Sequence, residues 1–366
     1  MRILILSCGT GGGHNATGRA MAQIVASHGG QALFPDYLTW AGDRVARVVD
    51  NAYIGTVRHA PRLFGQVYHL GMAVSRHWKR SPVYYANSRM AGYLQDYLRQ
   101  HPVDAIVMPH LYPAETVTWL RRKGMKLPLT VAIATDYTCV PFWEETDCDY
   151  YVLPAPELMD DFAGRGIPRE KLLPLGIPVS RECELPLTRQ QACERLGLDS
   201  QETFIMAMGG SMGAGDMLEL VQCLIRQTRT EKIIAVAGGN ARVLQSLTQL
   251  NCPRLSVISR TAQVPLYPRA CSLLFTKPGG LTSTEAAVCQ IPMVHTAPIP
   301  GCETENQRYF AARGMSVTAA TAEGQVRAGL DLLHSPQAAD QMRLCQRQHI
   351  PAGAAERIYQ MLLSKI

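Results

Sequence analysis

The stretch ILILSCGTGGGHNATGRA, residues 3–20, joins an apolar run to a glycine-rich turn and then to a helix-like segment. Four of the five positions from Gly9 to Gly13 are glycine, and His14 follows them. A buried strand, a tight turn and a helix in this order are typical of a parallel α/β sheet. The turn fits a phosphate cradle, a catalytic position for His14, or a plain strand-to-helix connection.

The same rhythm recurs along the chain in two series of short apolar runs separated by helix-like segments. The first series lies at 3–6, 103–108, 129–134, 150–153 and 172–175, and the second at 204–208, 233–237, 255–258, 273–275 and 293–295. Strands this apolar are covered on both faces, which predicts two parallel sheets flanked by helices. We expect one domain over 1–180 and another over 181–366, with the last helix returning to the first domain, and ligands at the strand ends in the cleft between them.

Length and composition are those of a globular protein. The chain has 366 residues, 47% of them apolar and 18% charged, which suits two domains and excludes a disordered chain. Its 11 cysteines are scattered without a CxxC pair, which favours reduced thiols in the cytosol. No apolar stretch reaches the roughly 18 residues of a membrane-spanning helix, and the first residues read as a strand rather than a signal peptide.

Positive charge gathers in one part of the first domain. No Asp or Glu occurs between Asn51 and Gln95, whereas basic and aromatic residues alternate there. The basic and aromatic residues that we single out are Arg58, Arg62, Arg76, Trp78, Lys79 and Arg80. Such a mixture suits an anionic membrane surface or a nucleic-acid backbone, and a solvated helical hairpin is the plainer alternative.

Four glycine-rich turns follow predicted strands, at 9–13, 209–215, 237–240 and 277–280. None has the GxxxxGK[ST] pattern, which argues against a P-loop nucleotidase. GGSMG at 209–213 also fits the nucleophile elbow of a serine hydrolase, with Ser211 as nucleophile. That alternative needs an acid and a histidine from later in the chain; the candidates are Glu285, Glu303 or Asp331 with His295, His334 or His349.

The sequence DCD at 147–149 raises the possibility of a divalent metal site, because paired aspartates hold Mn²⁺ or Mg²⁺ under a diphosphate. It directly precedes an apolar run, where acidic residues commonly end a loop. We favour that structural interpretation.

The most specific stretch is LLFTKPGGLTSTEAAVCQIPMVHTAPIPGCETENQRYFAARG, residues 273–314. It resembles the donor-binding segment of the monogalactosyldiacylglycerol synthases and the bacterial processive diacylglycerol glucosyltransferases, which belong to glycosyltransferase family 28. Residues 7–20, 134–143 and 176–180 are similar to further segments of that group. The resemblance implies the GT-B fold, an α/β architecture of two Rossmann-like domains with parallel sheets facing across a cleft. The first would bind acceptor and membrane, and the second the UDP-sugar.

The resemblance also implies site residues. It assigns Glu285 to the ribose hydroxyls, and Glu303 and Asn306 to the diphosphate and donor sugar. The other donor-binding positions that it implies are Gly12, Gly13, Gly209, Gly210, Ser211, Asn240, Gly279, Gly280 and Thr282. His14 matches a histidine that is catalytic base or orients the acceptor, and Asp136 is the candidate to orient it.

The reaction implied is inverting transfer of glucose or galactose from a UDP-sugar to 1,2-diacylglycerol. A histidine suits the removal of the acceptor proton, and backbone N–H groups can stabilise the leaving UDP, so we expect no metal and no cofactor. The basic stretch would dock the enzyme on the inner face of the cell membrane from the cytoplasm, and no nucleic-acid partner is expected. Another lipid or soluble acceptor is the main alternative, followed by a serine esterase that uses Ser211.

Overall fold

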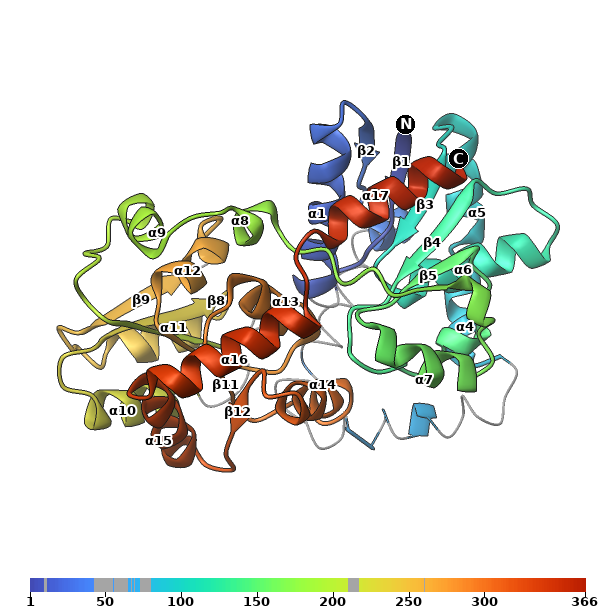
Figure 1. Cartoon of the computed structure of the whole chain (residues 1–366). Coiled ribbons are helices and arrows are strands. Elements are labelled where there is room, and N and C mark those ends of the chain that lie inside the picture. The colour runs from blue at the N-terminus through green and yellow to red at the C-terminus, as the bar shows by residue number, and fades with distance from the viewer. Residues whose placement is uncertain are drawn as a thin grey trace. The chain divides into compact units, whose positions relative to one another are not determined.

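The computed structural model describes residues 1–9, 12–42, 55, 65–66, 68, 70–72, 80–209, 217–259 and 261–366. The chain divides into two compact units (Figure 1). The first unit comprises Met1–Val179, Pro300–Cys302 and Gly353–Ile366, and the second comprises Ser180–Ile299 and Glu303–Ala352. The division at Val179 and Ser180 therefore falls within the polar segment between the two series of apolar runs.

The first unit contains a parallel sheet of six strands in the order β2-β1-β3-β4-β5-β6. The strands are β1 (Arg2–Ile5), β2 (Gln31–Leu33), β3 (Ala105–Met108), β4 (Leu129–Ile133), β5 (Tyr150–Val152) and β6 (Leu172–Leu173). The α-helices of this unit whose bounds lie within the described ranges are α1 (Gly12–Ser27), α4 (Pro82–Ser88), α5 (Ala91–Gln100), α6 (Leu111–Arg122), α7 (Met159–Gly164) and α17 (Ala354–Lys365). The central strands are apolar because helices cover both of their faces.

The last helix, α17, completes the core of the first unit, and Figure 1 shows it beside α1. Its buried residues Ala355, Ile358, Tyr359 and Leu362 follow the three- and four-residue spacing of one helix face. They pack in one cluster with strand residues such as Ile5 and with α1. The sheet is therefore covered by residues from both ends of the chain.

The second unit contains another parallel sheet of six strands, in the order β12-β11-β10-β7-β8-β9. The strands are β7 (Phe204–Met208), β8 (Lys232–Gly238), β9 (Leu255–Ser259), β10 (Leu273–Thr276), β11 (Met293–His295) and β12 (Val317–Thr318). The helices are α8 (Arg181–Glu184), α9 (Arg189–Leu196), α10 (Met217–Gln227), α11 (Ala241–Thr248), α12 (Tyr267–Ala270), α13 (Gly280–Cys289), α14 (Cys302–Ala312), α15 (Ala322–Leu333) and α16 (Pro336–His349). Apolar residues of β7, β8 and β10 form a core with α10 and α15.

Each sheet has a point where the strand order reverses. In the first unit, β1 lies between β2 and β3; in the second, β7 lies between β8 and β10. Ligands of such open sheets bind beyond the carboxyl ends of the strands at this point. The turn before His14 follows β1, whereas Gly209 follows β7 and residues 277–280 follow β10. The glycine-rich turns therefore lie where each sheet favours ligand binding.

The predicted α/β class with two parallel sheets is confirmed. Sequence reasoning missed two short edge strands, β2 and β12, and it made β6 longer than the two residues observed. An edge strand pairs on one side only and is partly exposed, as Gln31 and Thr318 are, so it leaves no apolar run in the sequence.

The interior of the first unit holds a carboxyl group on α6. Glu115 is fully buried, and Asn87 Nδ2 on α4 donates a hydrogen bond to its Oε2. Burial raises the pKa of Glu115 well above its usual value despite that hydrogen bond, and the nearby Glu145 carboxylate raises it further. Burial therefore favours the uncharged form of the Glu115 carboxyl group in the folded protein.

This protonation makes stability depend on pH in a defined direction. The pKa of Glu115 is higher in the folded than in the unfolded chain. Its contribution to the free energy of unfolding is therefore complete below the pKa of the unfolded chain and is lost as the pH rises toward the pKa of the folded chain. We expect Glu115→Gln, which stays neutral and still accepts from Asn87, to gain stability over the wild type between pH 5 and pH 8. The gain is up to about 1.4 kcal/mol for each pH unit between the two pKa values.

Urea unfolding at several pH values measures this difference. Glu170→Gln, at an exposed position, is the control. If the free energy of unfolding of Glu115→Gln differed from that of the wild type by the same amount at every pH, a raised pKa of Glu115 would be contradicted.

Candidate active site

His14 lies in the first turn of α1 and is half-buried. Its Nδ1 is 2.8 Å from the carbonyl oxygen of Pro109 and 3.0 Å from Oγ1 of Thr135. A carbonyl oxygen can only accept, so Nδ1 carries the hydrogen and donates it. Neutral His14 therefore has its lone pair on Nε2, which is the arrangement of a general base.

The surroundings of His14 keep its ring neutral. Burial lowers its pKa below the usual value, while the negative charge of Asp136 and the hydrogen bond to Pro109 partly oppose this effect. Thr135 and Asp136 come shortly after β4, and Pro109 directly follows β3, so the ends of two strands supply the neighbours of one ring. A neutral imidazole at neutral pH is ready to accept a proton.

A second histidine, His110, contacts His14 edge to face, with ring centroids 4.5 Å apart. His110 caps the N-terminus of α6, and its Nδ1 accepts a hydrogen bond from the Tyr112 N–H at 3.1 Å. Burial and the neighbouring His14 hold the pKa of His110 well below its usual value. Sequence reasoning missed His110, although its place directly after an apolar run of the parallel sheet was a signal that could have found it.

In the second unit, the predicted donor-binding residues cluster on two helices. Gly279 is the N-cap of α13, which also carries Gly280, Thr282 and Glu285. Glu303 and Asn306 lie one turn apart on α14. Asn306 is fully buried, and its Nδ2 donates to the Pro278 carbonyl at 3.0 Å. This contact gives Asn306 a structural role, so its binding of the donor stays a prediction.

Glu303 contacts the loop before α13. Its Oε2 accepts from the Ile299 N–H at 2.6 Å and lies 3.8 Å from Nζ of Lys277. Sequence reasoning overlooked Lys277, although it belongs to the quoted KPGG turn. The structure therefore adds a cation to this group of residues.

Other predicted positions have local roles. Asn240 caps α11, with its side chain accepting from the N–H groups of Arg242 and Val243. Gly12 and Gly13 begin α1, and Gly209 is buried after β7. At Gly279, φ is −69° and a Cβ atom would meet open space, so the protein's own packing does not require glycine there. Ligand approach remains a reason for glycine at Gly279.

Several predicted residues lie outside the described part of the chain. They are Gly210 and Ser211 in the second unit, and Arg58, Arg62, Arg76, Trp78 and Lys79 in the basic stretch. Arg80 is described; it is exposed, and its guanidinium lies 5.7 Å from the ring centre of Tyr84.

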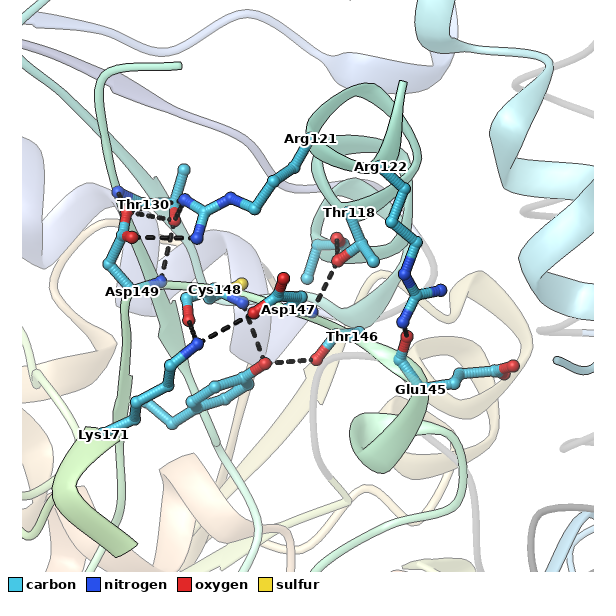
Figure 2. A network of polar contacts seen from close by, with 12 residues as sticks. Thr118, Arg121, Arg122, Thr130, Glu145, Thr146, Asp147, Cys148, Asp149 and Lys171 are labelled. Atoms are coloured by element: carbon cyan, nitrogen blue, oxygen red, sulfur yellow. Dashed lines mark hydrogen bonds and ion pairs between the residues drawn. The ribbon is translucent and has the colours of Figure 1, made fainter. Parts of the chain in front are cut away.

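The DCD sequence forms a network of ion pairs, shown in Figure 2. Arg121 donates to both carboxylate oxygens of Asp149 at 2.8 and 2.7 Å, and Lys171 donates to Asp147 at 2.8 Å. Although burial opposes it, hydrogen bonds from Arg121 and Thr130 lower the pKa of Asp149. The two aspartates join α6, β4 and residues near β6, which is a structural role.

Among the residues that the structure describes, no group of three or more His, Cys, Asp or Glu side chains is arranged to hold a metal ion. Within the same ranges, no helix has the length and apolar character needed to cross a bilayer.

His295, a candidate histidine of the serine-hydrolase alternative, lies in the core of the second unit. His295 is fully buried, and its two ring nitrogens lie 3.0 and 3.1 Å from the hydroxyls of Ser283 and Ser316. Burial lowers the pKa of His295 to about 3. Both nitrogens are engaged within the core, so this residue is not placed as a catalytic base.

Comparison with known proteins shows which sequences and structures this chain resembles. The family model of monogalactosyldiacylglycerol (MGDG) synthase matches residues 14–179. A processive diacylglycerol beta-glucosyltransferase of Staphylococcus saprophyticus is 28% identical over 256 residues, 69% of this chain and 64% of that relative, so the match spans just under two thirds of its length. The protein of the same description from Bacillus pumilus is 23% identical over 349 residues, 93% of this chain and 89% of that one.

Solved structures show the same fold. MurG of Acinetobacter baumannii superposes with a TM-score of 0.64 at 16% identity over 99% of both chains. Anabaena HepE in complex with UDP-glucose gives 0.58 at 14% identity over 100% of both chains. The two parallel sheets therefore have the GT-B fold of these solved structures. Within this fold, the chain is similar to the monogalactosyldiacylglycerol synthases over residues 14–179 and to processive diacylglycerol glucosyltransferases over most of its length.

The structural role of the DCD sequence makes a prediction. Asp149→Asn removes the charge that two Arg121 hydrogen bonds require, and we expect the free energy of unfolding to fall by about 1–3 kcal/mol. Glycosyl transfer by the folded variant should stay near the wild-type rate. Urea unfolding and an activity assay in EDTA measure the two effects. If the Asp149→Asn variant is fully folded and as stable as the wild type but no longer transfers the sugar, a metal site at DCD is the better interpretation.

Proposed function

We propose that this protein transfers glucose or galactose from a UDP-sugar to the free hydroxyl of 1,2-diacylglycerol, with inversion to a β-glycosyl diacylglycerol. The observation that carries the proposal is the orientation of His14, whose Nδ1 donates to Pro109 and whose Nε2 is left as the base. The names of its relatives, which are diacylglycerol beta-glucosyltransferases, supply the acceptor class. The UDP-glucose complex of HepE supports the donor class.

In this mechanism, the acceptor hydroxyl attacks the anomeric carbon of the sugar. His14 Nε2 takes the hydroxyl proton as the new carbon–oxygen bond forms. The bond between the anomeric carbon and the β-phosphate oxygen breaks, and its electron pair leaves with UDP. Such transfers pass through an oxocarbenium-like transition state, so acceleration depends on removing the proton and stabilising the leaving group. Asp136 favours the imidazolium that His14 becomes, because its negative charge raises the pKa of that ring.

The second unit has the chemistry that a nucleotide donor requires. Gly279 and Gly280 stand at the N-terminus of α13, where backbone N–H groups favour a phosphate. Glu285, half-buried on the same helix, is suited to accept hydrogen bonds from two ribose hydroxyls. We propose that these groups bind UDP without a metal ion or other cofactor.

Products of the purified protein test this function. The protein is incubated with diacylglycerol liposomes, EDTA and either UDP-glucose or UDP-galactose, and lipids are identified by mass spectrometry. Hexosyl diacylglycerol from one donor is the expected result. No product with diacylglycerol, but transfer to another lipid or a soluble acceptor, would overturn the acceptor assignment. Restoration of activity by Mn²⁺ alone would overturn metal independence.

His14 carries a more specific prediction. We expect His14→Gln to lower kcat by about 10²–10⁴-fold, since general-base catalysis contributes on that order, while UDP affinity is unchanged. Because the pKa of His14 lies below its usual value, wild-type activity should persist through pH 6.5 and fall in more acidic solution. The variant should lack this acidic limb. His334→Gln, at an exposed position of the second unit, is the matched control. Wild-type turnover in His14→Gln would exclude its role as base.

We further propose that α4 and α5 take part in attachment to the inner, anionic face of the cell membrane. Tyr85 and Tyr93 are 50% and 49% exposed, and Arg80 and Arg89 are exposed beside them. Tyr85, Arg89 and Tyr93 are spaced four residues apart, which places them on one face of a nearly continuous helical segment. We call these four residues the α4–α5 patch. Tyrosine and arginine together suit a lipid–water interface.

The α4–α5 patch predicts dependence on lipid charge. Arg89→Gln should weaken binding to anionic vesicles about fivefold, because a basic residue near such a surface contributes about 1 kcal/mol. Tyr85→Ser with Tyr93→Ser should weaken binding to neutral and anionic vesicles alike. Vesicle flotation measures both effects, with Arg327→Gln on α15 as the control. Unchanged flotation of the Arg89 and tyrosine variants would exclude this patch.

A further inference from the structure

A buried lysine stands at the strand-order reversal of the second unit. Lys277 directly follows β10 and precedes Pro278, Gly279 and α13. Of the lysines and arginines in the described ranges, it alone is buried, with 9% of its side chain exposed. Burial of a cation costs free energy unless an anion lies nearby. Such a position calls for an explanation in terms of a ligand or a partner.

Glu303 is a partial answer. Its carboxylate lies 3.8 Å from the Lys277 ammonium, and burial lowers the pKa of Lys277 while Glu303 raises it. This separation exceeds hydrogen-bond distance, and an ammonium group has three donors. Glu303 also accepts from the Ile299 N–H at 2.6 Å, so α14 holds the carboxylate in place. The pair is therefore an ionic contact that leaves donor capacity on Lys277.

The backbone around Lys277 is fixed before any ligand arrives. The Gly279 N–H donates to the Lys277 carbonyl at 2.8 Å, which closes a tight turn. Asn306, one turn beyond Glu303 on α14, holds the Pro278 carbonyl at 3.0 Å. Two residues of α14 thus hold the KPGG turn at the end of β10. Preorganised charge of this kind stabilises a transition state without further rearrangement.

Charge also decides between the two side chains. A diphosphate is repelled by a carboxylate, so Glu303 is unsuited to bind it, whereas Lys277 beside the N-terminus of α13 is well suited. We propose that Lys277 binds the diphosphate of the nucleotide sugar and offsets the negative charge on UDP as the bond to the anomeric carbon breaks. Glu303 is the positioning residue for Lys277. This assignment rests on the proposed function. It makes Lys277, in place of Glu303, the residue predicted to bind the diphosphate.

Binding of UDP and uridine to the full-length protein tests the assignment by calorimetry. Lys277→Met removes the charge and keeps the length, and it should weaken UDP about 10- to 100-fold while uridine affinity changes less than twofold. Lys277→Arg should recover part of the UDP affinity. Lys232→Met, at a half-exposed ion pair on β8, is the control and should leave both affinities unchanged. Equal loss of UDP and uridine, or unchanged UDP binding, would overturn the proposal.

Glu303→Gln provides an independent variant if Lys277→Met does not fold. It keeps an acceptor for the Ile299 N–H but removes the negative charge, so UDP affinity should be retained or increased. A tenfold loss of UDP affinity in Glu303→Gln would show that UDP binding requires the Glu303 carboxylate itself and would overturn the role of Lys277. The calorimetry uses no acceptor, so it does not depend on the transfer reaction. If the binding results are as expected but the liposome assay yields no hexosyl diacylglycerol, the proposed function is contradicted and the assignment of Lys277 stands.

Discussion

Parallel strand pairing at the two points of order reversal is the constraint on which the other features depend. In the first unit, Ile5 on β1 pairs with Val107 on β3; in the second, Met208 on β7 pairs with Thr276 on β10. Because paired parallel strands end at the same edge, residues about 70 to 100 positions apart in the sequence emerge side by side. This pairing brings His14 to Pro109 and His110, and it sets the end of β7 beside the end of β10.

Burial lowers the pKa of basic side chains in both units. In the first, it lowers the pKa of His14 and His110, so both rings are neutral and His14 can accept a proton. In the second, burial also lowers the pKa of Lys277, but the carboxylate of Glu303 opposes it and favours the cation. A group that removes a proton and a group that offsets negative charge need these contrasting surroundings.

Much of the fold could be predicted from local sequence. The central strands are apolar on both faces and left clear runs, whereas β2 and β12 are short edge strands that left none. Sequence patterns were less informative about the interaction partners and burial of charged and titratable side chains. DCD suits a metal in sequence, yet Arg121 and Lys171 occupy its carboxylates. His110 and Lys277 were missed because a single histidine or lysine has no periodic signal, and only its burial and neighbours reveal its environment.

The sequence by itself determined the two parallel sheets, the glycine-rich turns after their strands and the resemblance to a known family, because apolar periodicity and short motifs are local properties of the chain. Tertiary structure decided which nitrogen of His14 carries the hydrogen, since that depends on the carbonyl of Pro109, 95 residues away. It also decided that Asp149 is an ion-pair partner and that Lys277 is a buried cation beside Glu303. Protonation and charge depend on distance and burial, and these exist only once distant segments pack together.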